Sequence, residues 1–342
     1  MQSAGRISFF SAALAAGWIA ACGGAPEPAT APPAPAPEPP PVAAEPPPAP
    51  APAAENAAPA AAPAAPPADA PIMVSDGIST PETVIHDPDQ DAYLVSNING
   101  NALEVDDNGY IAKLSPEGKV TEGRFIDGAK PDIKLNAPKG MTLAGDKLYV
   151  ADITFVRIFD RKTGAPAGEL EVKGSTFLNG LATGPDGAVY LSDSGLKAGK
   201  EGFEPTGTDA VYRIDPAKKN KITPVAKNKD LGRPNGLAVD QSGVWVVTFG
   251  TGELYRLSPK GQKEAAVKLP KGQLDGLVLL EGGSVLASSW EGQAVYRGTG
   301  AGAFEPVVSN VKSPAGIGYD AKRKRVLIPS FMGNVVQISP IK

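Results

Sequence analysis

Six short motifs recur along this 342-residue chain, and five of their second residues have side chains able to do chemistry. Each motif is followed by a short alternating apolar segment, which is typical of a β-strand. Successive second residues stand 40, or 56 to 57, residues apart. A period near 40 built from short strands indicates a β-propeller with one blade per repeat. The motifs start at Pro81, Pro138, Leu178, Pro234, Leu274 and Pro314.

The second residues should occupy equivalent points around one axis, because the innermost strand of each propeller blade lines the central channel. We call this set the axial ring: Glu82, Lys139, Asn179, Asn235, Asp275 and Ala315. Two carboxylates and two amide oxygens converging on one axis suit a hard divalent cation. Ca²⁺ is the first expectation, with Mg²⁺, Mn²⁺ and Zn²⁺ as alternatives. Polar residues that only solvate a wet channel are the competing interpretation.

The predicted fold is therefore all-β: a six-bladed propeller with four-stranded blades over residues 73–342. The last repeat ends after three strands, and Ile72 to Ser75 precede the first repeat with no blade of their own. We expect this N-terminal strand to complete the sixth blade. The two longer repeats carry insertions near residues 97–108 and 195–208, which are either lids over the axial ring or surface decoration.

The N-terminal part of the chain differs from the propeller in composition. Residues 1–22 resemble a bacterial lipoprotein signal peptide, with an apolar run that ends at Ile19-Ala20-Ala21-Cys22. This resemblance implies lipid attachment at Cys22, with ordinary secretion as the alternative. Residues 23–72 are almost entirely Ala, Pro and Glu, which favours an extended stalk without a core. We expect a propeller anchored by lipid, at the outer membrane and facing the periplasm.

Charge and single-residue counts exclude other classes. The net charge of −4 gives no basic face for nucleic acid, and the run from Lys322 to Arg325 falls where a turn between strands is expected. One cysteine and one histidine make a zinc site of the usual kind hard to build. Nothing in the sequence argues for an oligomer, so a monomer is expected.

The repeats also resemble a known family of six-bladed propellers, which includes gluconolactonase, regucalcin and luciferin-regenerating enzyme. The resemblance spans about residues 80–340 and is carried by Arg233-Pro234-Asn235-Gly236-Leu237, Leu274-Asp275-Gly276-Leu277 and Pro81-Glu82. It implies that Glu82, Asn235 and Asp275 bind a divalent metal, and that Asn179 lies near metal and substrate. Two positions depart from the pattern. Gly180 stands where many relatives have Asp, and Lys139 places a cation in the ring.

The function implied is a metal-dependent hydrolase of a lactone or related ester. Asp275 would accept the proton of the attacking water, Asn179 would orient a small-molecule substrate, and Lys139 would bind that substrate or stabilise the oxyanion. Lys139 could instead compete with the metal or pair with a carboxylate. The alternative from another class is a non-catalytic propeller of the cell envelope that binds a small molecule or a protein, since one fold serves both roles.

Overall fold

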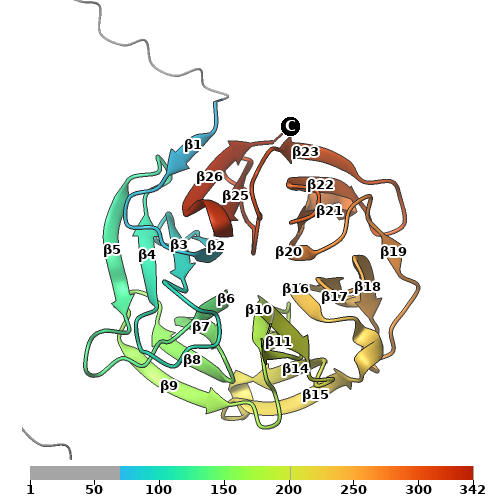
Figure 1. Ribbon diagram of the computed structural model, residues 1–342, viewed down its shortest axis with the longest axis horizontal. Coiled ribbons are helices and arrows are strands. Elements are labelled where there is room, and N and C mark those ends of the chain that lie inside the picture. The colour runs from blue at the N-terminus through green and yellow to red at the C-terminus, as the bar shows by residue number, and fades with distance from the viewer. Residues whose placement is uncertain (1–69, 201, 342) are drawn as a thin grey trace, which may run out of the picture. The chain divides into compact units, whose positions relative to one another are not determined.

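The computed structural model describes residues 70–200 and 202–341, and the predicted signal peptide, Cys22 and nearly all of the predicted stalk lie outside them. Six antiparallel four-stranded sheets are arranged around a central channel (Figure 1). The predicted six-bladed propeller is confirmed. In the described part of the chain, no helix is long and apolar enough to cross a membrane.

The first three blades each run from an inner strand at the channel to an outer strand at the rim. Blade 1 consists of β2 (Pro81–Asp87), β3 (Ala92–Asn97), β4 (Tyr110–Leu114) and β5 (Val120–Asp127). Blade 2 consists of β6 (Pro138–Ala144), β7 (Lys147–Asp152), β8 (Phe155–Asp160) and β9 (Pro166–Glu171). Blade 3 consists of β10 (Leu178–Thr183), β11 (Val189–Asp193), β14 (Ala210–Asp215) and β15 (Lys221–Lys227).

The other three blades repeat this order, except that the last is completed from the beginning of the propeller. Blade 4 consists of β16 (Pro234–Asp240), β17 (Gly243–Thr248), β18 (Glu253–Leu257) and β19 (Val267–Lys268). Blade 5 consists of β20 (Leu274–Leu279), β21 (Ser284–Ser289), β22 (Ala294–Thr299) and β23 (Glu305–Ser309). Blade 6 consists of β24 (Gly318–Asp320), β25 (Arg325–Ser330), β26 (Val335–Pro340) and β1 (Ile72–Val74).

The predicted closure of the ring is present. Strand β1 pairs antiparallel with β26, with Met73 opposite Gln337, so that the sixth blade contains both ends of the propeller (Figure 1). Without β1, blade 6 would have three strands and β26 would be its unpaired outer edge. The predicted turn is also present: residues 321–324 connect β24 to β25, which begins at Arg325.

Four short 3₁₀ segments and one extra hairpin complete the described elements. The 3₁₀ segments are η1 (Pro216–Lys218), η2 (Lys229–Leu231), η3 (Glu281–Gly283) and η4 (Phe331–Gly333). The hairpin is formed by β12 (Leu196–Gly199) and β13 (Gly202–Pro205), and it is the second predicted insertion. The first insertion is the loop of residues 98–109 between β3 and β4. Both leave the second strand of their blade, as expected.

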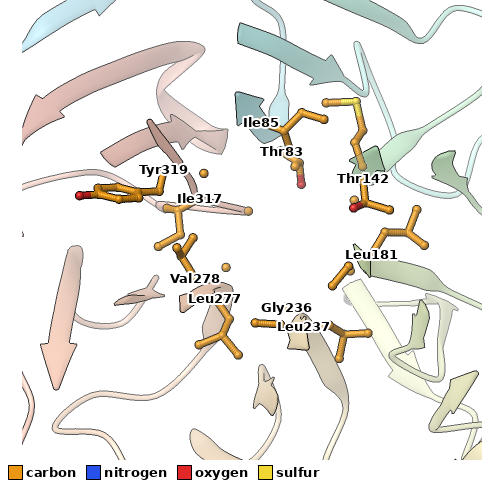
Figure 2. Close-up of a pocket in the computed structure, with 18 of the residues that line it drawn as sticks. Thr83, Ile85, Thr142, Leu181, Gly236, Leu237, Leu277, Val278, Ile317 and Tyr319 are labelled. Atoms are coloured by element: carbon orange, nitrogen blue, oxygen red, sulfur yellow. The ribbon is translucent and has the colours of Figure 1, made fainter. Parts of the chain in front are cut away.

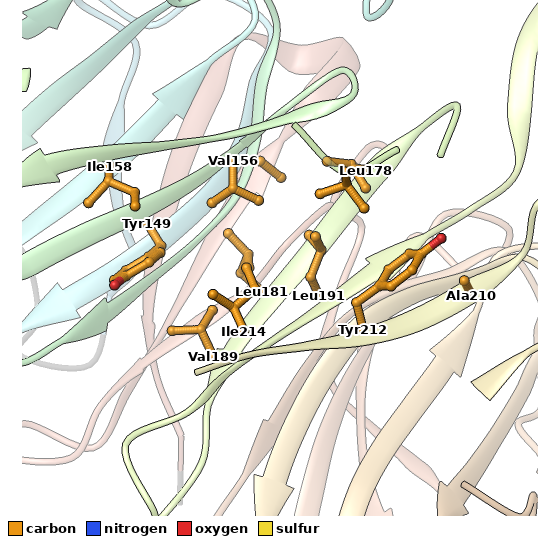
Figure 3. Packing of buried hydrophobic residues seen from close by; sticks show 12 residues of the cluster. Tyr149, Val156, Ile158, Leu178, Leu181, Val189, Leu191, Ala210, Tyr212 and Ile214 are labelled. Atoms are coloured by element: carbon orange, nitrogen blue, oxygen red, sulfur yellow. The ribbon is translucent and has the colours of Figure 1, made fainter. Parts of the chain in front are cut away.

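The core lies between neighbouring blades, where apolar faces of adjacent sheets pack together. Figure 3 shows one such interface, in which Tyr149, Val156 and Ile158 of blade 2 pack against Leu181 and Leu191 of blade 3. Further clusters of buried apolar residues recur around the propeller. Burial of this apolar surface, distributed around the whole circle, is what holds the inner strands at fixed positions.

Candidate functional site

The inner strands of blades 1 to 5 place five ring residues at the same end of the channel, whereas Ala315 precedes β24, the inner strand of blade 6. In five blades, the pairing between the first and second strand is irregular between the first and fourth residues of the motif. An irregularity of this kind re-aims side chains that would otherwise alternate across the sheet. The ring side chains are almost fully buried: Glu82, Lys139, Asn179, Asn235, Asp275 and Ala315.

The glycine that follows the ring residue in five motifs is required by close approach between neighbouring inner strands. A Cβ on Gly236 would lie 2.2 Å from the Asp275 carbonyl oxygen, and a Cβ on Gly180 would lie 2.3 Å from that of Asn235. Both distances are shorter than an ordinary carbon–oxygen contact. Gly180, which departs from the family pattern, is thus explained by packing: a side chain there would push blades 3 and 4 apart.

Serine hydroxyls tie alternate blades to the next at the level of the ring. The Ser192 Oγ accepts from the Gly180 N–H at 2.8 Å and donates to the Asn235 carbonyl at 2.7 Å. Ser96 makes the corresponding pair of bonds between Thr83 and Lys139. Ser288 repeats the arrangement in blade 5. The backbone carrying the ring is therefore fixed by both packing and hydrogen bonds.

A cavity of about 140 Å³ opens above the ring. Five ring residues line its floor, and the four predicted metal ligands are among them. The structure thus brings together the residues that the sequence placed on one axis: Glu82, Lys139, Asn179, Asn235 and Asp275. Below the ring, the channel continues between apolar side chains such as Leu181, Leu237 and Ile317 (Figure 2).

Two buried oxygens on the cavity floor have no hydrogen-bond partner within the described residues: Asn179 Oδ1 and Asp275 Oδ1. The orientation of the Asn179 amide follows from its neighbours. The Ser194 hydroxyl donates to the Pro234 carbonyl at 2.8 Å, so it can only accept from Asn179, whose Nδ2 lies 3.1 Å away. The amide oxygen is thereby left free. Buried oxygens without partners are costly unless a ligand or ion satisfies them.

The charged ring residues influence one another. Burial raises the pKa of Glu82 to about 7, against the opposing effects of the Thr83 hydroxyl, 2.6 Å from its Oε2, and of Lys139. Burial also raises the pKa of Asp275 well above its usual range, and the nearby Glu82 carboxylate adds to this shift. Two acidic groups that both resist ionisation form a site that favours a cation between them.

Lys139 is held by the protein and is only 1% exposed. Its ammonium donates to the carbonyls of Ala102 at 2.9 Å and Ala137 at 3.1 Å, and it lies 4.5 Å from the centre of the Phe177 ring. Burial lowers its pKa to about 8, although Asp152 and Glu82 oppose the shift. Two of its three N–H groups donate to carbonyls, and the carbonyl of Ala102 belongs to the first insertion. The third N–H group is left for a ligand.

The described residues contain no group of three or more His, Cys, Asp or Glu side chains arranged to hold a metal. An ion at this site would therefore need amide oxygens besides its two carboxylates. The free oxygens of Asn179 and Asp275, together with Glu82 and Asn235 in the same cavity, form such a donor set. Oxygen donors of mixed charge fit Ca²⁺ or Mg²⁺.

An apolar wall surrounds the cavity above the ring. Its aromatic residues are Phe177, Phe203, Phe249, Trp290 and Phe331. Phe249, Trp290 and Phe331 each follow directly after the second strand of their blade. Equivalent positions in successive repeats were thus a signal that could have found them. Trp290 contacts both phenylalanines, with ring centres 5.4 and 5.2 Å apart.

Both insertions contribute to this wall. Ile98 and Ala102 come from the first, and Leu196 and Phe203 come from the second. Phe203 packs edge-on against Phe177, with ring centres 5.4 Å apart. The insertions therefore reach the cavity instead of only decorating the rim of the propeller.

Asp152 and Asp193, at the ends of second strands, position the backbone that precedes two of the motifs. The Asp152 carboxylate accepts from the Ala137 N–H at 2.8 Å, and the Asp193 carboxylate accepts from the Phe177 N–H at 2.9 Å. These buried bonds fix the start of β6 and β10, and hence the places of Lys139 and Asn179.

Comparison with known proteins adds a relative in sequence. A gluconolactonase from Zymomonas mobilis subsp. mobilis (strain ATCC 31821 / ZM4 / CP4) is 30% identical over 142 residues, which are 34% of this chain and 36% of that protein. Over this stretch the chain is similar to that gluconolactonase. The aligned part spans about a third of that relative's length. No family model matches the chain.

Solved structures show the same fold at low identity. A gluconolactonase from Xanthomonas campestris has a TM-score of 0.60 at 18% identity, over 80% of this chain and 89% of its own. Luciferin-regenerating enzyme has a TM-score of 0.59 at 14% identity, over 79% and 95%. Virginiamycin B lyase from Staphylococcus aureus has a TM-score of 0.55 at 15%, over 80% and 99%. The predicted resemblance to gluconolactonase-type propellers is confirmed. The lyase shows that the fold alone does not decide the reaction.

Proposed function

We propose that this protein is a metal-dependent hydrolase of a lactone or related ester, acting at the axial ring. The observation that carries the proposal is the pair of buried, unpartnered oxygens of Asn179 and Asp275 in one cavity with Glu82 and Asn235. Similarity to a gluconolactonase over a third of the chain supports the reaction class.

Glu82, Asn179, Asn235 and Asp275 would hold one divalent ion, with Ca²⁺ as the first candidate. When bound, such an ion supplies a Lewis acid that polarises a carbonyl and lowers the pKa of a water molecule. The residues of the chain then have separate tasks. Asn179 is oriented by Ser194 so that its amide oxygen faces the cavity, where it can accept a hydrogen bond from water or substrate.

Proton movement falls to Asp275. Its carboxylate belongs to the cavity, and its Oδ1 has no hydrogen bond among the described residues. It can take a proton from the attacking water as the new C–O bond forms, and return it to the alkoxide that leaves when the ester bond of the ring breaks. The remaining N–H of Lys139 can donate to the oxyanion between these steps. The product is a hydroxy acid.

Hydrolysis of a small lactone panel by the chelator-treated protein, with and without added Ca²⁺, tests the proposal. We expect turnover that depends on the ion and is lost in Asp275→Asn, a change that keeps the shape of the side chain. A Ser242→Ala variant, altered in a turn outside the cavity, should retain the activity. Absence of turnover on every lactone, with or without each divalent ion, would reject the hydrolase and leave the non-catalytic binding propeller.

We further propose that the propeller is tethered to the cell envelope by lipid at Cys22. The lipobox-like sequence before this residue supports the proposal. Expression in a bacterial host with radiolabelled palmitate should label the wild-type protein and leave Cys22→Ser unlabelled. Equal absence of label from both proteins would reject the lipid anchor.

A further inference from the structure

The chemistry of the cavity wall differs from that of its floor. Above the ring, the lining is formed by aromatic and aliphatic side chains together with Ser194. The Ser194 hydroxyl is already committed, since it donates to the Pro234 carbonyl and accepts from Asn179. The apolar side chains are Ile98, Ala102, Phe177, Leu196, Phe203, Phe249, Trp290 and Phe331.

This distribution disfavours a polyhydroxylated ligand. A sugar lactone carries a hydroxyl group on most of its ring carbons, and each needs a hydrogen-bond partner once it leaves water. The one donor in the wall that makes no hydrogen bond of good geometry among the described residues is the Trp290 indole N–H, and it is directed at the Asp275 carboxylate, whose pKa it lowers. The other groups free for a ligand, Asn179 Oδ1, Asp275 Oδ1 and the third N–H of Lys139, belong to the floor, where the reacting ester must be placed.

The size of the cavity limits the reacting part of the substrate. Its volume is about 140 Å³. A dry apolar cavity of roughly 150 Å³ in another protein accommodates benzene. The site above the ring therefore has room for one five- or six-membered ring, with any longer substituent directed out of the cavity.

An exposed aromatic side chain, Phe203, stands at the opening of the cavity. Phe203 lines the cavity and is nevertheless 51% exposed, so its ring lies at the opening. Val105 is 77% exposed on the first insertion, and Met332 is 56% exposed beside Phe331 on η4. Three of the five exposed large apolar side chains in the described residues thus stand on segments that line this cavity. Such side chains could cover an alkyl chain leaving the cavity.

We infer that the substrate of this site is a small lactone ring bearing an alkyl chain, not a sugar lactone. The lactone ring of the substrate lies over the axial ring and is enclosed by Phe249, Trp290 and Phe331. Its alkyl chain passes along Phe203. This inference rests on the proposed function, because it names the substrate class of the same site. Each methylene that leaves water along this path should raise kcat/KM about fourfold.

The first test compares kcat/KM of the full chain, supplied with Ca²⁺, for γ-nonalactone, γ-butyrolactone and glucono-δ-lactone. We expect γ-nonalactone to exceed γ-butyrolactone at least tenfold and glucono-δ-lactone at least a hundredfold. Phe203→Ser should lower the value for γ-nonalactone about tenfold more than that for γ-butyrolactone. Val307→Ser, which alters another exposed apolar residue on β23, is the matched control. Preference for glucono-δ-lactone would overturn the inference while leaving the hydrolase intact.

A second test separates this inference from the proposed reaction. The cyclic ketone 2-pentylcyclopentanone cannot be hydrolysed, and its binding can be followed by titration calorimetry beside gluconate as a polar competitor. Binding that is weakened at least fivefold in Phe203→Ser and unchanged in Val307→Ser would support the apolar ligand even if no lactone were turned over. No binding of the ketone, or tighter binding of gluconate, would overturn it.

Discussion

Replacing Gly236 with alanine should open the axial ring, because the inner strands of blades 4 and 5 approach each other closely at this glycine. The new Cβ would lie 2.2 Å from the Asp275 carbonyl oxygen and 2.9 Å from the Leu277 amide nitrogen. Both obstacles are backbone, so no side-chain rotation relieves them. The strands must separate by about 1 Å, and this overpacking should cost about 3 kcal/mol. For a propeller of this size, that lowers the melting temperature by about 6 °C.

The displacement should also reach the chemistry, since Asp275 itself has to move. A misplacement of about 1 Å in a reacting group lowers kcat/KM about a hundredfold. The matched control is Gly123→Ala on β5, where the nearest atom to the new Cβ is a Val120 methyl at 3.7 Å. Differential scanning fluorimetry and lactone hydrolysis are measured on both variants. Equal melting temperatures for Gly236→Ala and Gly123→Ala would refute the reasoning.

Two further substitutions probe the charges of the ring. In metal-free protein, wild type should lose about 3 kcal/mol of unfolding free energy relative to Glu82→Gln between pH 4.5 and 7. The reason is that the folded-state pKa of Glu82 is raised to about 7, so folding opposes its ionisation over this interval. Urea titrations that gave the same difference at both pH values would contradict this. Lys139→Met should change the unfolding free energy by less than about 2 kcal/mol, since removal of a buried charge offsets the loss of two hydrogen bonds. Lys139→Met should nevertheless speed amide hydrogen exchange in the loop around Ala102 at least tenfold. Lys218→Met, at the surface, is the control and should leave this exchange unchanged. Unchanged exchange in Lys139→Met would show that Lys139 does not hold the first insertion in place.

The sequence allowed the propeller and its ring to be predicted because both follow from repetition. Equivalent residues in successive repeats must occupy equivalent places, whatever the details of packing. The pairing of β1 with β26, which closes the ring, could be predicted in the same way. The last repeat lacks its fourth strand, and one extra strand precedes the first repeat. Repetition did not give the lengths of the outer strands, which range from β19 (Val267–Lys268) to β5 (Val120–Asp127).

Other features depend on contacts that no local pattern encodes. The binding of the Lys139 ammonium to Ala102 joins residues 37 positions apart through an insertion of irregular shape. The same holds for the contact between Phe177 and Phe203. Through such contacts the insertions place apolar side chains above the polar ring residues, which therefore form the floor of an apolar cavity. The need for Gly180 likewise becomes visible only when the next strand is in place.

The most direct test of the metal site is a calorimetric titration of Ca²⁺ into the chelator-treated protein, as wild type and as Asp275→Ala. We expect saturable binding to one site in wild type and loss of that binding in the variant, with melting temperatures showing that both proteins are folded. Absence of binding by wild type for Ca²⁺, Mg²⁺, Mn²⁺ and Zn²⁺ alike, or equal binding by both proteins, would contradict it.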